Sequence, residues 1–391
     1  MMSDNLRGRA FAVAFFVISV LVAVLMVPEL NKYGTEAIML AAENEFMYEK
    51  VIHILAMLVM GFGFLMVFAK KYCYTTITST YILVALSLPL YMLIRPYLWG
   101  TSADLAITNI SMLLFAEFAA ASLLIAIGGP LCRINTSQYL FIGLLFTPIY
   151  AINEWILLSG SVIPAGAFLD TAGSVVIHAF GAYFAFGMIT MLSKKKNVDV
   201  STSKTSNQFA MLGSAALWVF WPSFCSALVA VEQIPLVAVN TVLALCGSTL
   251  STYVFSFLIR GKIEIADIAN ASLAGGVAIG ATVADVAPGW SMLIGLIAGM
   301  ISVVGFTMIQ PRLEELTGGI DSCGVHNLHG MTGVFGGLIA VLLVASPTWQ
   351  LTGVIFTVIF AIIMGVVVGF ITSKLGKTVT ITDDTKEFCT E

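Results

Sequence analysis

Two histidines lie in matching sequence contexts, and their type and spacing point most directly to chemistry. Asp170-Thr-Ala-Gly is followed by four residues and then His178, and Asp321-Ser-Cys-Gly is followed by four residues and then His329. Both copies read D-[ST]-[AC]-G-x4-H, and both begin an apolar run. A neutral imidazole offers one hydrogen-bond donor and one acceptor. A facing pair can therefore receive a small polar guest in apolar surroundings.

The composition shows that these surroundings are a membrane. Of the 391 residues, 59% are hydrophobic and 10% are charged, whereas soluble domains average roughly 25% charged residues. This excludes a soluble enzyme and a disordered chain. The net charge of −4 gives no basic field for nucleic acid. The six cysteines form no CxxC pair, so we expect no disulfide framework, no metal site and no cofactor.

Twelve segments are long and apolar enough to span a bilayer, which takes about 20 residues. Barrel strands would alternate apolar and polar residues, and these runs do not, so we predict an all-α polytopic membrane protein with one channel domain over 1–391. Residues 10–27 are either a retained first helix, which we favour, or a signal peptide, which gives 11–12 transmembrane helices. The twelve segments are 10–27, 50–69, 78–94, 107–128, 138–158, 170–193, 208–228, 235–259, 265–284, 288–310, 321–344 and 349–373.

Loop charges set the expected orientation. With the N-terminus inside, all lysines and arginines except Lys32, Lys50 and Arg95 fall on the cytoplasmic side, which is 15 of 18. Cytoplasmic loops of membrane proteins carry such an excess of basic residues. We therefore expect a multi-pass protein whose tail, residues 374–391, is cytoplasmic.

The two histidine motifs also predict an inverted repeat. They fall in the sixth and eleventh spans, and five spans is an odd number, so the two copies run in opposite directions through the membrane. The first repeat covers 50–193, the second covers 208–344, and 349–373 is the last helix. Eight helical residues rise about 12 Å, and half the hydrocarbon core is about 15 Å. Both histidines should therefore lie near the midplane, neutral and facing each other, because burial disfavours the charged form.

Four stretches resemble the Rh branch of the ammonium transporter/Rh superfamily, in its bacterial type. They are DTAGSVVIHAFGAYF (170–184), LWVFWPSF (217–224), NASLAGGVAIG (270–280) and DSCGVHNLHGMTG (321–333). The resemblance implies an ammonia channel, not an enzyme. It also implies a homotrimer in the cell (inner) membrane with one pore through each protomer.

The resemblance also implies roles for single residues. His178 and His329 would be the twin pore histidines, Phe118 and Phe224 the paired phenylalanine gate, and Asp170 the outer aspartate that meets ammonium. Leu158 stands where Amt-type members carry a tryptophan, which favours low-affinity ammonium recruitment.

Other polar residues in the predicted spans allow a structural or a functional interpretation. Glu154 either attracts cations at the outer mouth or bonds to a neighbouring helix. His326, three residues before His329 and expected on roughly the same helix face, either lines the inner exit or is structural. Asp321 is expected to act as a helix cap, and Asp170 as a cap that also stabilises an arriving cation.

Three alternatives to an ammonia channel stay open on the sequence. A proton-coupled ammonium transporter would carry current, whereas a channel for neutral ammonia would not. A channel for carbon dioxide, or for both gases, would be distinguished from an ammonia channel by testing ammonia and carbon dioxide gradients separately. A membrane sensor is disfavoured because the short tail carries no recognisable signalling domain.

Overall fold

The computed structural model describes residues 43–69, 74–100, 109–192 and 203–375, together with Ala14, Val17, Ile18, Leu21 and Asp384. The elements in these ranges are helices, as expected for an all-α membrane protein. The predicted first span, 10–27, falls almost wholly outside the described residues, as does most of the tail.

The first repeat contains five long helical segments. They are α2 (Glu43–Ala56) continued by η2 (Met57–Phe62), α3 (Gly63–Leu65) and η3 (Met66–Ala69), then α4 (Tyr74–Trp99), α5 (Ile110–Gly128), α6 (Thr136–Leu158), and η5 (Ser174–Ala179) continued by α7 (Phe180–Leu192).

The second repeat has five corresponding segments, and one further helix follows. They are α8 (Lys204–Cys225), η6 (Val231–Gln233) continued by α9 (Ile234–Arg260), α10 (Ile265–Ala271) with α11 (Ala274–Ile279), α12 (Pro288–Val304) with η7 (Gly305–Ile309) and α13 (Gln310–Thr317), η8 (His326–Gly330) with α14 (Met331–Ala340), and α15 (Pro347–Leu375). These eleven segments match predicted spans two to twelve. Within the described ranges, eight candidate spans are long and apolar enough to cross a membrane, and Ile265–Ile279 is a shorter apolar helix.

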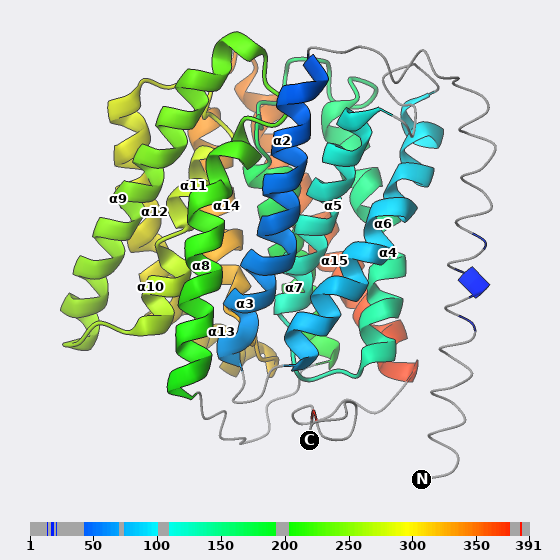
Figure 1. Cartoon of the computed structure of the whole chain (residues 1–391), viewed down its shortest axis with the longest axis vertical. Helices are drawn as coiled ribbons and strands as arrows, with labels where there is room; N and C mark the ends of the chain where they lie inside the picture. The colour runs from blue at the N-terminus through cyan, green and yellow to red at the C-terminus, as the bar shows by residue number, and fades with distance from the viewer. Residues whose placement is uncertain are drawn as a thin grey trace.

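Hydrogen bonds near the two ends of the bundle join segments that are far apart in the chain. At one end, Gln138 Nε2 donates to the Thr372 carbonyl at 3.2 Å, and Ser322 N donates to the Gly129 carbonyl at 2.9 Å. At the other end, Lys50 Nζ donates to the Ser226 carbonyl at 2.5 Å. We call the end with Gln138 and Thr372 the basic end, after the basic loops expected there, and the end with Lys50 and Ser226 the distal end. The basic end is at the bottom of Figure 1, where α13 lies and α8 begins.

The two repeats lie side by side (Figure 1). Helices α4 and α6 of the first repeat lie on one side, α9, α10 and α12 of the second lie on the other, and α2 and α8 stand in front between them. Glycines allow the closest crossings: a Cβ added to Gly295 of α12 would lie 2.0 Å from the Ala244 carbonyl of α9. A Cβ on Gly365 of α15 would lie 2.2 Å from the Phe184 carbonyl of α7. Small residues serve this purpose widely in membrane helices.

Candidate functional site

The two predicted histidines meet at the centre of the bundle. His178 Nδ1 lies 3.2 Å from His329 Nδ1, and the two rings are nearly parallel, with an interplanar angle of 6°. Both side chains are buried. Because one nitrogen of each neutral ring carries the hydrogen, one Nδ1 donates and the other accepts. His178 Nε2 has no hydrogen-bond partner among the described residues, so this atom remains available to a guest.

The repeated motif builds the same turn in front of each histidine. In both copies the glycine has a left-handed conformation, with φ of 77° at Gly173 and 65° at Gly324, which glycine adopts without steric cost. Each aspartate then accepts hydrogen bonds from the first N–H groups of the following helix. Asp170 accepts from Val175 and Val176, and Asp321 accepts from Val325 and His326. The expected cap at Asp321 is present, and Asp170 makes the equivalent cap.

The helical turns that carry the histidines are π-helical rather than α-helical. His178 lies in η5 and His329 in η8, and both segments are π-helices. Such short π segments recur at functional sites and have a wider turn than the α-helix. Two side chains three residues apart therefore point in more divergent directions than in an α-helix.

His326 lies in the same π-helical segment as His329. Its ring packs against Tyr183 and Phe186 of α7, with centroids 5.5 and 5.8 Å apart. It borders a cavity of about 240 Å³ beside Gln310 and Glu314. His329 instead borders a different cavity, of about 300 Å³. A role for His326 in lining the inner exit stays a prediction.

The cavity beside His329 is mostly apolar. It leads from the histidine pair toward the basic end, and it has one polar amide in its wall. Its lining residues are Phe62, Leu65, Met66, Leu124, Ile125, Asn270, Cys323, Val325, Leu328 and His329.

The two predicted gate phenylalanines are in contact on the distal side of the histidines. Phe118 of α5 and Phe224 of α8 have ring centroids 4.8 Å apart at a tilt of 59°, and both are buried. The Phe224 ring also lies 6.0 Å from the His178 ring. The rings and the histidine pair therefore form one continuous group along the bundle axis.

Two aromatic residues that the sequence interpretation missed complete this group. Trp221 of α8 stacks on His178 with centroids 5.7 Å apart, and Phe62 of η2 stacks on His329 at 6.3 Å. Each ring comes from the first helix of the repeat opposite to that of its histidine. The position of Trp221, three residues before Phe224, was a signal that could have revealed it, whereas nothing around Phe62 marks it.

Glu154 takes the second of its two predicted roles. Its carboxylate is buried and accepts from Arg95 Nη1 at 2.7 Å, and the Tyr91 hydroxyl also donates to it. An acid already neutralised by an arginine of a neighbouring helix is not free to attract cations from solvent. Across the described ranges, no three His, Cys, Asp or Glu side chains gather in a group that could hold a metal ion.

The site and fold can be compared with known proteins. A family model of the Ammonium Transporter Family matches residues 14–388. The ammonium transporter Rh type B of Danio rerio is 36% identical over 317 residues, which are 78% of this chain and 67% of the relative. The Rh type A transporter of Canis lupus familiaris is 37% identical over 316 residues, 76% of this chain and 72% of its own.

A solved structure of Nitrosomonas europaea Rh50, described with the mechanism of conduction by the Rhesus protein family of channels, is 46% identical to this chain. It superposes with a TM-score of 0.84 and covers 88% of this chain and 91% of its own. A sensor Amt protein shares the fold at 20% identity, with a TM-score of 0.76 over 90% of this chain and 97% of its own.

Proposed function

The chain belongs to the ammonium transporter family, and from that premise we propose that it is a membrane channel that conducts neutral ammonia. The observation that carries the proposal is the 3.2 Å contact between His178 and His329, two buried histidines from oppositely directed repeats. Ionisable residues inside a membrane bundle are costly to bury, and they usually mark a pathway for a substrate or ion.

The proposed path begins at the distal end, where ammonium arrives and loses its proton. A charged group at the bilayer centre costs about 3 kcal/mol or more, whereas neutral ammonia needs only hydrogen-bond partners. Ammonia passes Phe118 and Phe224, which exclude water and hydrated ions. It then bonds to the histidine pair, where His178 Nε2 is a free partner. It leaves through the apolar cavity beside His329.

Asp170 keeps two roles in this proposal. It caps the turn that holds His178, and its negative charge favours a cation at the distal mouth. Glu154 has no part in recruitment, because Arg95 already pairs with it. We also propose that the basic end faces the cytoplasm, that the protein resides in the cell (inner) membrane, and that it assembles as a homotrimer with one pore in each protomer.

The test is stopped-flow fluorescence on proteoliposomes that contain a pH dye. An inward ammonia gradient should alkalinise the lumen faster than in protein-free liposomes, and membrane current should be absent. A current that follows ammonium would support a proton-coupled transporter instead. If the protein accelerated the pH change under a carbon dioxide gradient but not under an ammonia gradient, carbon dioxide would be the conducted gas. Ammonia permeability equal to that of protein-free liposomes would overturn the proposal.

A further inference from the structure

A buried arginine at the distal end joins an ion pair to a set of aromatic rings. The Arg95 guanidinium carbon lies 3.6 Å from the centroid of Phe115 and 4.3 Å from that of Trp99. Arg95 Nη1 donates to Glu154 at 2.7 Å and to the Tyr91 hydroxyl at 2.5 Å. Two hydrogen bonds therefore hold the guanidinium, and its central carbon lies over an aromatic ring.

The Phe115 ring connects this cluster to the gate. Phe115 and Phe118 are one turn apart on α5, and their rings meet edge to face, with centroids 6.5 Å apart at 89°. Phe118 in turn contacts Phe224 at 4.8 Å. A continuous series of contacts therefore runs from Glu154 through Arg95 and Phe115 to the gate.

Fold stability alone is a weak reason for a buried ion pair here. Desolvation of two charges often cancels their attraction, and an apolar replacement of both is frequently neutral or stabilising. A guanidinium over an aromatic face is different, because the contact is directional and gains strength when water is excluded. The arrangement fits a residue that fixes a ring better than one that merely adds stability.

We propose that Arg95 is a positioning residue for the phenylalanine gate. It holds Phe115 by a cation–π contact, Phe115 holds the angle of Phe118, and Glu154 with Tyr91 holds Arg95. This inference rests on the proposed function, in which Phe118 and Phe224 decide what enters the pore. It adds a selectivity determinant that itself lies outside the pore.

The test compares three variants by their permeability ratio of methylammonium to ammonia in proteoliposomes. Arg95→Lys keeps a cation for Glu154 but loses the flat face over Phe115, and Phe115→Leu removes the ring while keeping the ion pair. We expect both to raise the ratio by up to about thirtyfold, which corresponds to the roughly 2 kcal/mol of a desolvated cation–π contact. Phe115→Leu keeps the proposal testable if Arg95→Lys fails to fold.

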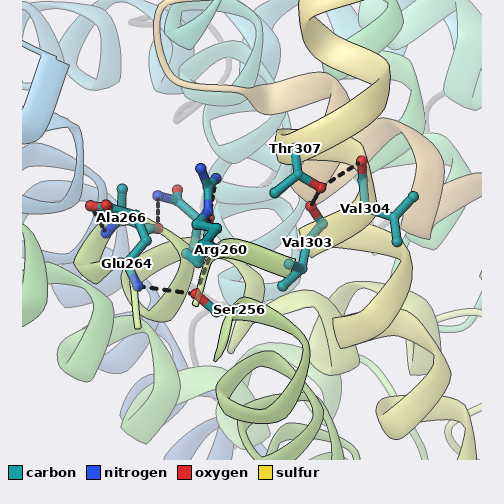
Figure 2. Close-up of polar contacts among 9 residues, drawn as sticks. Ser256, Arg260, Glu264, Ala266, Val303, Val304 and Thr307 are labelled. Atoms are coloured by element: carbon teal, nitrogen blue, oxygen red, sulfur yellow. Dashed lines mark hydrogen bonds and ion pairs between the residues drawn. The ribbon is translucent and has the colours of Figure 1, made fainter. Parts of the chain in front are cut away.

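Arg260→Lys is the matched control. Arg260 pairs with Asp267 through Nε at 2.8 Å and Nη2 at 3.0 Å, but it lies at the basic end, beside Ser256 and Glu264 (Figure 2). The same exchange there should leave the ratio unchanged. An equal rise in Arg260→Lys would show a general loosening of the bundle and would overturn the proposal.

A double substitution separates positioning from general damage. If Arg95 acts through Phe118, adding Arg95→Lys to Phe118→Ala should not change the ratio further, because the ring that it positions is gone. If each substitution instead raised the ratio independently, so that the two fold-changes multiplied in the double variant, the proposal would be contradicted. So would a native ratio in folded Arg95→Lys and Phe115→Leu. The proposed function itself would fail by a different observation, namely that the wild-type protein does not accelerate ammonia entry.

Discussion

At the scale of single residues, the histidine pair is held by stacking as well as by its mutual contact. Trp221 stacks on His178 at an interplanar angle of 16°, and Phe62 stacks on His329 at 27°. Ring stacking of this kind contributes about 0.5–1.5 kcal/mol beyond burial. The two imidazoles therefore keep their Nδ1 atoms together, and the Nε2 atom of His178 has no hydrogen-bond partner within the described part of the chain.

Removing one histidine should impair conduction. His178→Ala leaves His329 Nδ1 without its partner, and an unpaired buried polar group costs about 1–3 kcal/mol. A loss of that size corresponds to roughly tenfold to hundredfold in rate. We expect ammonia permeability in stopped-flow assays to fall by about tenfold in His178→Ala and in His329→Ala.

His53→Ala provides the control for this prediction. The His53 ring bonds to Ser223 at 2.8 Å and stacks on Phe220, away from the pair, so ammonia permeability should be native. If folded His178→Ala and His329→Ala both conducted at the native rate with native selectivity, the pair would be structural.

For the gate phenylalanines we predict an increase in permeation rather than a decrease. Phe118→Ala and Phe224→Ala each remove one ring of the 4.8 Å contact and widen the constriction. We expect methylammonium uptake and ion leak to rise, most strongly in the double variant. Radiolabelled methylammonium flux and membrane current measure this. A folded double variant with an unchanged selectivity profile would assign both rings to packing alone.

At the scale of elements, the two turns D-x-x-G govern where the histidines point. A Cβ on Gly173 would lie 2.3 Å from Ile177 Cδ1, and a Cβ on Gly324 would lie 2.1 Å from Phe306 Cε1. Each glycine also has positive φ. The turns therefore combine a left-handed backbone, which would strain any residue but glycine, with close approach, and any larger residue must shift the helix start that carries the histidine.

Alanine substitutions can separate these two costs. Gly173→Ala should lower the free energy of unfolding by roughly 2–4 kcal/mol, from left-handed strain and crowding together. Gly166→Ala, with φ of 74° and nothing within 4 Å, should cost only the strain, about 1 kcal/mol. Gly289→Ala has neither cost. Thermal unfolding in detergent should rank the three midpoints in this order, and equal midpoints for Gly173→Ala and Gly289→Ala would contradict the account.

The same elements show what sequence reasoning can and cannot predict. The spacing D-x-x-G-x4-H and its inverted repetition predicted the contact between His178 and His329, because an odd number of spans and a helical rise are enough for that. The π turn that carries His326 and His329 was not predicted, since such a turn leaves no mark in hydropathy. The partner of Glu154 could not be predicted, because Arg95 lies 59 residues away on another helix and only tertiary packing brings the two together.

At the scale of the whole molecule, the start of α8 and the ends of α9 and α15, which carry Lys204, Arg260 and Lys374, lie at the basic end (Figure 1). Asp384 of the C-terminal segment belongs to the same end, since it accepts a hydrogen bond from Tyr74 N at the start of α4. These described helix ends agree with the charge bias expected from the sequence, which assigns 15 of 18 lysines and arginines to one side.

The charge bias predicts which end is cytoplasmic. Basic residues are retained inside during membrane insertion, so the basic end should face the cytoplasm and the distal end the outside.

Labelling with a membrane-impermeant maleimide can test this in a variant whose six native cysteines are replaced. Cysteine at Glu232, exposed at the distal end, should react in intact cells. Cysteine at Lys204, exposed at the basic end, should react only after the membrane is opened. Labelling of Lys204→Cys but not of Glu232→Cys in intact cells would reverse the orientation, and with it the direction in which Asp170 and the phenylalanine gate meet ammonium.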